Sequence, residues 1–176
     1  MDPTSQDETR VVPVYHVTYA GRLATIARHG LLPNARSGFG GDAYDFNKKG
    51  RIFVTEKEGI DYWFNKARDH AFDASDNVWK DGLVPVVLAV AIRHRFVRGK
   101  MVSDELGSSD AMHDAWYTTK TIPATRLKVF NGRTWLSIDR FRKEDAAKAV
   151  KKVREDGTSW YELIEPSPLQ PFVEVE

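Results

Sequence analysis

Residues 11–33 of the chain read VVPVYHVTYAGRLATIARHGLLP, and this stretch decides the fold. Its first half places a polar Tyr15-His16 pair among branched apolar residues, which favours a short β-strand. Its second half has apolar residues at helical spacing, until Gly30 stands where a helix usually stops and Pro33 blocks its resumption. The stretch therefore predicts a strand, a turn and a helix. His16 would lie near the end of the strand, a common place for a ligand group.

The composition is that of an ordinary globular protein. The 176 residues suffice for one domain with a real core, and they are 41% hydrophobic and 29% charged. The net charge of +1 gives no global field that would attract nucleic acid or an anionic membrane, although a local basic face stays open. The lack of cysteine excludes disulfides, thiolate zinc sites and a cysteine nucleophile. No apolar run is long enough to cross a bilayer, and we expect a cytoplasmic monomer without membrane contact.

The chain is predicted to form one domain. Residues 1–10 are polar and acidic, and we interpret them as a flexible N-terminus. Residues 11–140 hold the domain itself. Residues 141–176 add a charged helix with one apolar face and a proline-rich extended tail, packed on the same domain.

Two further local patterns fix the expected sheet. Residues 83–92 are almost continuously apolar, which predicts a strand buried on both faces, with Pro85 near its start and residues 93–95 ending it in solvent. The pair Asn131-Gly132 between two alternating runs predicts a two-residue hairpin turn. Residues 70–82 have no clear period and are predicted to be a loop, and residues 99–112, which are polar and contain Gly and Ser, are predicted to be another.

A second strand-to-helix unit begins at Arg51. Residues 51–55 read RIFVT and predict a strand, and Thr55 with Glu58 has the spacing of a capping box. The helix that follows carries an apolar stripe that includes Phe64. Further on, residues 116–118 have β propensity, with Asp114 before them and Ile122-Pro123 after them.

The first unit resembles the first motif of the ADP-ribosyltransferase superfamily. In that motif a strand ends in Tyr-His-x-Thr or His-Gly-Thr, and a helix leads to Gly-Leu. The matching residues here are Tyr15-His16-Val17-Thr18 and, after the helix, Gly30-Leu31.

The second unit resembles the second motif of the same superfamily. In the diphtheria-toxin and poly(ADP-ribose) polymerase branch, two tyrosines eleven residues apart pack on the nicotinamide ring. Their positions here hold Phe53 and Phe64, which keep the ring face needed for stacking and lack the hydroxyl. Tyr62 and Trp63 are alternatives if the register slips. Phe64 also fits plain core packing, because it shares the apolar stripe of the helix.

The third segment resembles the strand that the catalytic glutamate opens in this superfamily, followed by Ile-Pro or Val-Pro. This chain has no glutamate there, and Asp114 is the nearest carboxylate. Asp110 and Glu105 are its rivals. A carboxylate at this place would stabilise positive charge on the ribose ring as its bond to nicotinamide breaks.

The resemblance implies an α+β protein with an ADP-ribosyltransferase-like split β-sandwich, a few helices packed around it and a cleft between the sheets. The implied activity is NAD-dependent transfer of ADP-ribose to a macromolecule, either protein or nucleic acid, with NAD as co-substrate and no metal. Asp114 and His16 would be the catalytic residues. The implied NAD-binding residues are Tyr15, His16, Thr18, Arg36, Phe53, Tyr62 and Phe64.

Arg36 belongs to a glycine-rich stretch, residues 34–42. In the family this region approaches the NAD phosphates, so Arg36 is the implied phosphate ligand; the alternative interpretation is a loop that only connects elements at the surface.

Two other functions stay open. The tRNA 2′-phosphotransferases share His-x-Thr, Gly-Leu and Val-Pro, bind phosphate with arginines and lack the catalytic glutamate. An inactive module that binds NAD or ADP-ribose would also suit the missing glutamate and hydroxyls.

Overall fold

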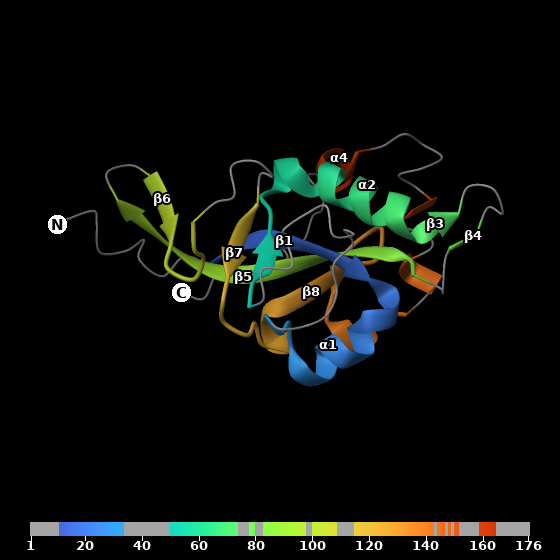
Figure 1. Ribbon diagram of the computed structural model, residues 1–176, viewed down its shortest axis with the longest axis horizontal. Coiled ribbons are helices and arrows are strands. Elements are labelled where there is room, and N and C mark those ends of the chain that lie inside the picture. The colour runs from blue at the N-terminus through green and yellow to red at the C-terminus, as the bar shows by residue number, and fades with distance from the viewer. Residues whose placement is uncertain are drawn as a thin grey trace.

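The apolar run at residues 83–92 becomes the central strand of the main sheet, as predicted (Figure 1). In spatial order the strands of this sheet are β1 (Val11–Tyr19), β5 (Pro85–Val97), β8 (Leu127–Phe130) and β9 (Trp135–Leu136). All neighbours pair antiparallel. Residues 86–90 of β5 are at most 2% exposed, so this strand is buried on both faces. Pro85 is its first residue, where a missing amide donor does least harm.

The computed structural model describes residues 11–33, 50–73, 78–79, 83–97, 100–108, 115–142, 144–146, 148, 150–151 and 159–164. Within them the protein is α+β, as predicted, with two antiparallel sheets and two main helices packed against them. The second sheet pairs β2 (Ile52–Val54) with β7 (Trp116–Thr118). Three further strands are short: β3 (Phe72–Asp73), β4 (Val78–Trp79) and β6 (Lys100–Ser103). β3 pairs with β4, and β6 pairs with the C-terminal end of β5.

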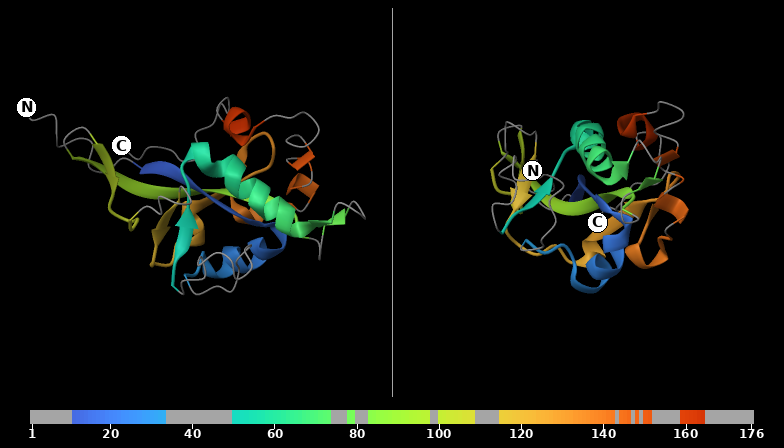
Figure 2. Two further views of the ribbon diagram at one scale, coloured as in Figure 1. Left: turned by 45° about the horizontal axis from the view of Figure 1, so that its top comes forward. Right: turned by 45° about the vertical axis from the view of Figure 1, so that its right-hand side comes forward.

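The two main helices lie on opposite faces of the main sheet (Figure 2). Helix α1 (Leu23–His29) buries its apolar side on the face that carries Val86, Leu88 and Val90 of β5. Helix α2 (Ile60–Ala71) covers the other face, where Val87 and Ala89 lie. The predicted stripe of α2 is fully buried: Ile60, Phe64, Ala67 and Ala71. Because side chains alternate along a strand, β5 contributes to two separate cores.

Short helical turns join these elements, and one short helix was not predicted. That helix is α4 (Trp160–Ile164), whose first backbone amide donates to the Asp61 carboxylate of α2 over 2.7 Å. The 3₁₀ turns are η1 (Ala20–Arg22), η3 (Lys57–Gly59), η5 (Ala124–Arg126) and η6 (Ile138–Arg140).

Three predictions about strand ends were wrong. Residues 93–95 do not end β5 in solvent, because the strand continues to Val97 by pairing with β6, and His94 is only 8% exposed. The predicted loop at residues 99–112 therefore contains a strand, β6. The predicted loop at residues 70–82 likewise contains the β3–β4 pair.

The hairpin at Asn131-Gly132 exists, but its turn is longer than predicted. Phe130 pairs with Trp135, so four residues form the loop. The Asn131 side-chain oxygen accepts from the backbone amides of Arg133 and Thr134, which stabilises this longer turn.

The predicted capping box at Thr55 is not formed. The Thr55 hydroxyl donates to the carbonyl oxygen of Glu56, and the backbone of Thr55 pairs with Tyr15. Helix α2 consequently begins later, at Ile60, after a 3₁₀ turn whose preceding residue makes no side-chain capping bond.

Several predictions fall partly or wholly outside the described residues. These are the flexible N-terminus at residues 1–10, the extended tail from residue 165, and parts of the helix expected within residues 141–156. Described helical residues there are 144–146, 148 and 150–151, and Ala146 and Val150 are buried as predicted. Among the described residues, no helix is both long enough and apolar enough to span a membrane.

Candidate functional site

The two strand-to-helix units meet directly where β1 and β2 cross. Tyr15 and Thr55 exchange two backbone hydrogen bonds, each 2.8 Å long. On its other edge β2 pairs with β7, with Phe53 opposite Tyr117. Backbone hydrogen bonds therefore join three segments that lie far apart in the sequence.

A second contact joins the ends of the first and third segments. Leu31, after α1, exchanges two backbone hydrogen bonds of 2.9 and 3.0 Å with Ile122, after β7. Gly30 ends α1 as predicted, with φ +75°. A Cβ atom there would lie 2.3 Å from the Ile122 carbonyl oxygen, so only glycine fits this approach.

His16 lies at the β1–β2 junction and is held by the backbone of β2. Its Nδ1 atom donates a hydrogen bond to the Phe53 carbonyl oxygen over 2.7 Å. Because a carbonyl oxygen only accepts, Nδ1 carries the proton and Nε2 is the acceptor atom of the neutral ring. Nε2 has no hydrogen-bond partner within the described part of the chain, and the side chain is partly exposed.

The environment of His16 keeps the ring neutral. Burial lowers its pKa, the hydrogen bond to Phe53 raises it, and the positive charge of Arg22 lowers it again; burial is the largest of the three. The net result is a pKa below the ordinary value for histidine. At neutral pH His16 is therefore an oriented acceptor, suited to a hydroxyl group of a ligand.

Arg22 is a residue of this region that the sequence analysis missed. Its guanidinium lies over the Tyr19 ring, 5.1 Å from the centroid, and burial lowers its pKa. It forms no ion pair within the described residues, and residues 11–33 contain no Asp or Glu at all. An arginine in the turn that follows a strand, without an acidic residue nearby in the sequence, was the signal that could have identified it.

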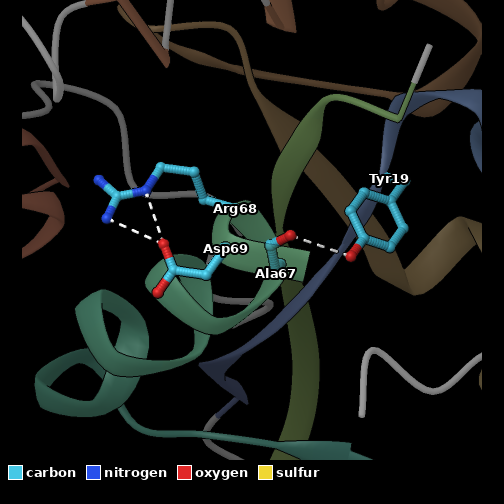
Figure 3. Close-up of polar contacts among 4 residues, drawn as sticks. All are labelled: Tyr19, Ala67, Arg68 and Asp69. Atoms are coloured by element: carbon cyan, nitrogen blue, oxygen red, sulfur yellow. Dashed lines mark hydrogen bonds and ion pairs between the residues drawn. The ribbon is translucent and has the colours of Figure 1, made fainter. Parts of the chain in front are cut away.

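Tyr19 itself is structural. Its hydroxyl donates to the Ala67 carbonyl oxygen over 3.0 Å, which ties β1 to α2 (Figure 3). Burial raises the pKa of Tyr19 to about 12. The adjacent Arg68–Asp69 pair in the same view is partly solvent-exposed, with 3.2 Å between Nη2 and Oδ1.

The other predicted residues of β1 divide between the two faces of the strand. Tyr15 points to the α2 side, where it is 5% exposed and packs 5.9 Å from the Trp135 ring. Thr18 shares the face of His16 by strand alternation and is 3% exposed. Of these two, only Thr18 lies on the same side as His16.

The three aromatic candidates lie in different places. Phe53 is half-buried at the junction and contacts Tyr117 edge-on, with 6.2 Å between centroids. Phe64 has no exposed surface and packs 4.9 Å from the Trp160 ring, which is the position of a core residue. Tyr62 is 44% exposed on α2, beside Trp63. The structure thus brings the backbone carbonyl of Phe53 to His16, whereas Phe64 lies in the core.

The two remaining candidates, Arg36 and Asp114, lie outside the described residues. The residue after Asp114 is Ala115, which is 1% exposed and leads into β7. Of the rival carboxylates, Asp110 is also outside the described residues.

Glu105 is described, and its contacts are structural. Its Oε2 accepts from the Arg126 guanidinium and from the Arg93 backbone amide. Arg93 lies in the gap between the residues of β5 that pair with β8 and those that pair with β6. Arg93 pairs with Val11 of β1 on its other edge, so Glu105 satisfies its amide on the edge that β8 and β6 share.

Comparisons of the chain with protein-family models, with curated proteins and with solved structures find no match. Among the described residues, no group of three or more His, Asp or Glu side chains is placed to hold a metal ion. Function is therefore inferred from the junction of β1, β2 and β7.

Proposed function

We propose that the protein is an NAD-dependent ADP-ribosyltransferase that modifies a macromolecular acceptor, on an ADP-ribosyltransferase-like split β-sandwich. The observation that carries the proposal is the meeting of the three segments that resemble the superfamily motifs. The first and second join at Tyr15 and Thr55, and the second and third pair along β2 and β7. The Gly-Leu and Ile-Pro sequences that end the first and third motifs also pair, at Leu31 and Ile122.

Three described residues support the proposal that NAD binds at this junction. His16 offers Nε2 as an acceptor for a ribose hydroxyl, and its Nδ1 bond to Phe53 fixes the ring. The Phe53 ring is half-buried and offers an aromatic surface to the flat nicotinamide. Arg22 supplies a positive charge near His16 without a competing ion pair in the described residues.

NAD would supply the ADP-ribose group, whose bond to the nicotinamide nitrogen breaks with the electron pair leaving on nicotinamide. Asp114 is assigned to face the positive charge that develops on the ribose ring, because its carboxylate stabilises that charge. His16 orients the sugar through a hydroxyl. The acceptor atom then bonds to the same ribose carbon and releases its proton.

Calorimetric titration of NAD into purified protein tests the site. His16→Ala should weaken NAD affinity by about 1–3 kcal/mol, roughly 5- to 150-fold, because one hydrogen bond in a polar site is lost. The matched control is His70→Ala, since His70 is an exposed histidine near the end of α2. Unchanged NAD affinity in a folded His16→Ala protein would exclude this site.

The same preparation separates the two other functions. Binding of NAD without release of nicotinamide would favour the inactive binding module. Removal of a 2′-phosphate from RNA with consumption of NAD would favour the phosphotransferase, in which arginines rather than a glutamate serve the substrate.

A further inference from the structure

Three segments of the chain contain no acidic residue. The segments 11–33, 50–55 and 115–138 contain no Asp or Glu, although the chain has 25 of them. These three segments are neighbours in space as well. Leu31 pairs with Ile122, and Ile52 pairs with Thr118. These segments therefore contribute positive and no negative side chains of their own, and among the described residues the Glu105 carboxylate pairs with Arg126 of the third segment.

The positive charges gather where these segments meet. The Gly50 amide donates to the Pro33 carbonyl oxygen over 3.2 Å, which places the start of β2 beside the end of the α1 segment. We call this region the basic end, and its members are Arg28, His29, Arg51 and Lys120. Arg28, His29 and Lys120 are exposed, and Arg51 is half-buried. Within the described part of the chain, none of the four forms an ion pair.

Aromatic rings adjoin the basic end on the second sheet. The Arg51 guanidinium lies 4.2 Å from the centroid of the Tyr117 ring. Tyr117 is half-buried and in turn contacts Phe53. Arg51, Phe53 and Tyr117 share one face of the β2–β7 sheet, because residues two apart in β2 point the same way and Phe53 lies opposite Tyr117. The stacking holds the guanidinium plane in place, which reduces the entropy lost when it binds a ligand.

We propose that the basic end binds single-stranded nucleic acid and that this nucleic acid is the acceptor of ADP-ribose. The second part, its role as acceptor, rests on the proposed function. Positive side chains next to aromatic and guanidinium planes are the combination that holds an unpaired strand, through its phosphates and its base faces. An acidic protein segment could bind to the positive side chains, but it has no planar bases that would stack on the aromatic and guanidinium groups. The position next to Phe53, whose carbonyl holds His16, brings such a strand to the proposed site of transfer.

Fluorescence anisotropy with a labelled single-stranded oligonucleotide of mixed sequence, in the absence of NAD, tests the inference. Three phosphate contacts, from Arg28, Arg51 and Lys120, should give a slope of log affinity against log salt of about −2, since each contact on a single strand contributes about −0.7. The double variant Arg51→Gln/Lys120→Gln should lose at least about tenfold in affinity at low salt, and its slope should be about −0.7.

The matched control removes two exposed positive charges elsewhere, with Arg142→Gln/Lys148→Gln. It should bind as the wild type does. Unlabelled oligonucleotide should displace the probe, and poly-glutamate should not. The single variant Lys120→Glu, at an exposed position, gives the same test if the double variant does not fold.

Three results would each overturn the inference: no binding by the wild type, an equal loss in the control, or equal displacement by poly-glutamate. Because the assay contains no NAD, its result is independent of whether the protein turns NAD over. Failure of the nucleic-acid surface and failure of the proposed transferase are thus distinguishable.

Discussion

Gly30→Ala tests whether the first and third segments are joined as described. Gly30 has φ +75° and ψ −173°, a region that is essentially reserved for glycine, so alanine there costs about 1–3 kcal/mol in backbone strain. The new Cβ would also lie 2.3 Å from the Ile122 carbonyl oxygen. Relieving that clash means moving the Leu31–Ile122 pair, whose two hydrogen bonds contribute about 0.5–1.5 kcal/mol each. The expected total loss in the free energy of unfolding is about 2–6 kcal/mol.

Urea unfolding followed by circular dichroism measures this loss. Gly21→Ala is the matched control, because a Cβ at Gly21 meets nothing within 4 Å. It should change the free energy of unfolding by less than about 1 kcal/mol, in either direction. If Gly30→Ala costs no more than Gly21→Ala, the described contact between the two segments does not exist in solution.

Two further predictions concern buried polar side chains. Tyr19→Phe removes the hydrogen bond to Ala67 and should lower the free energy of unfolding by about 1 kcal/mol in urea, whereas Tyr62→Phe, at an exposed ring, should not. Burial lowers the pKa of His94, and the negative charge of Glu105 raises it by a smaller amount. The His94 ring is therefore harder to protonate in the folded protein than in the unfolded chain. Stability should therefore fall as the pH drops below about 6.5, and His94→Leu should make that fall shallower; an identical pH profile in the variant would contradict this assignment.

Much of the fold was predictable because its signals are local. The apolar run of β5 and the buried stripe of α2 depend only on hydrophobic pattern, and both are as expected. The errors come from contacts between distant segments. β5 continues past Arg93 because β6 and the Glu105 carboxylate satisfy its edge. The Thr55 capping box fails because the Thr55 backbone pairs with Tyr15 instead.

The candidate site was predictable in one part and not in another. His16 was singled out because the sequence predicts it near the end of a strand, whereas β1 continues beyond it to Tyr19. Its orientation depends on the backbone carbonyl of Phe53, and no side-chain pattern reveals a backbone acceptor 37 residues away. Phe64 fitted both ligand contact and core packing, and only the tertiary position of α2 shows that it faces Trp160 in the core.

The central claim is that a carboxylate before β7 serves ADP-ribose transfer at the junction. Nicotinamide release from labelled NAD, measured with cell lysate as the source of acceptor, tests it most directly. Asp114→Asn keeps the shape and removes the charge, so NAD should bind with unchanged affinity while release slows by about 10²–10³. Glu105→Gln is the control, since that carboxylate serves Arg126 and Arg93, and it should keep its turnover. Full turnover by Asp114→Asn, or no nicotinamide release by the wild type with any lysate fraction, would contradict the account.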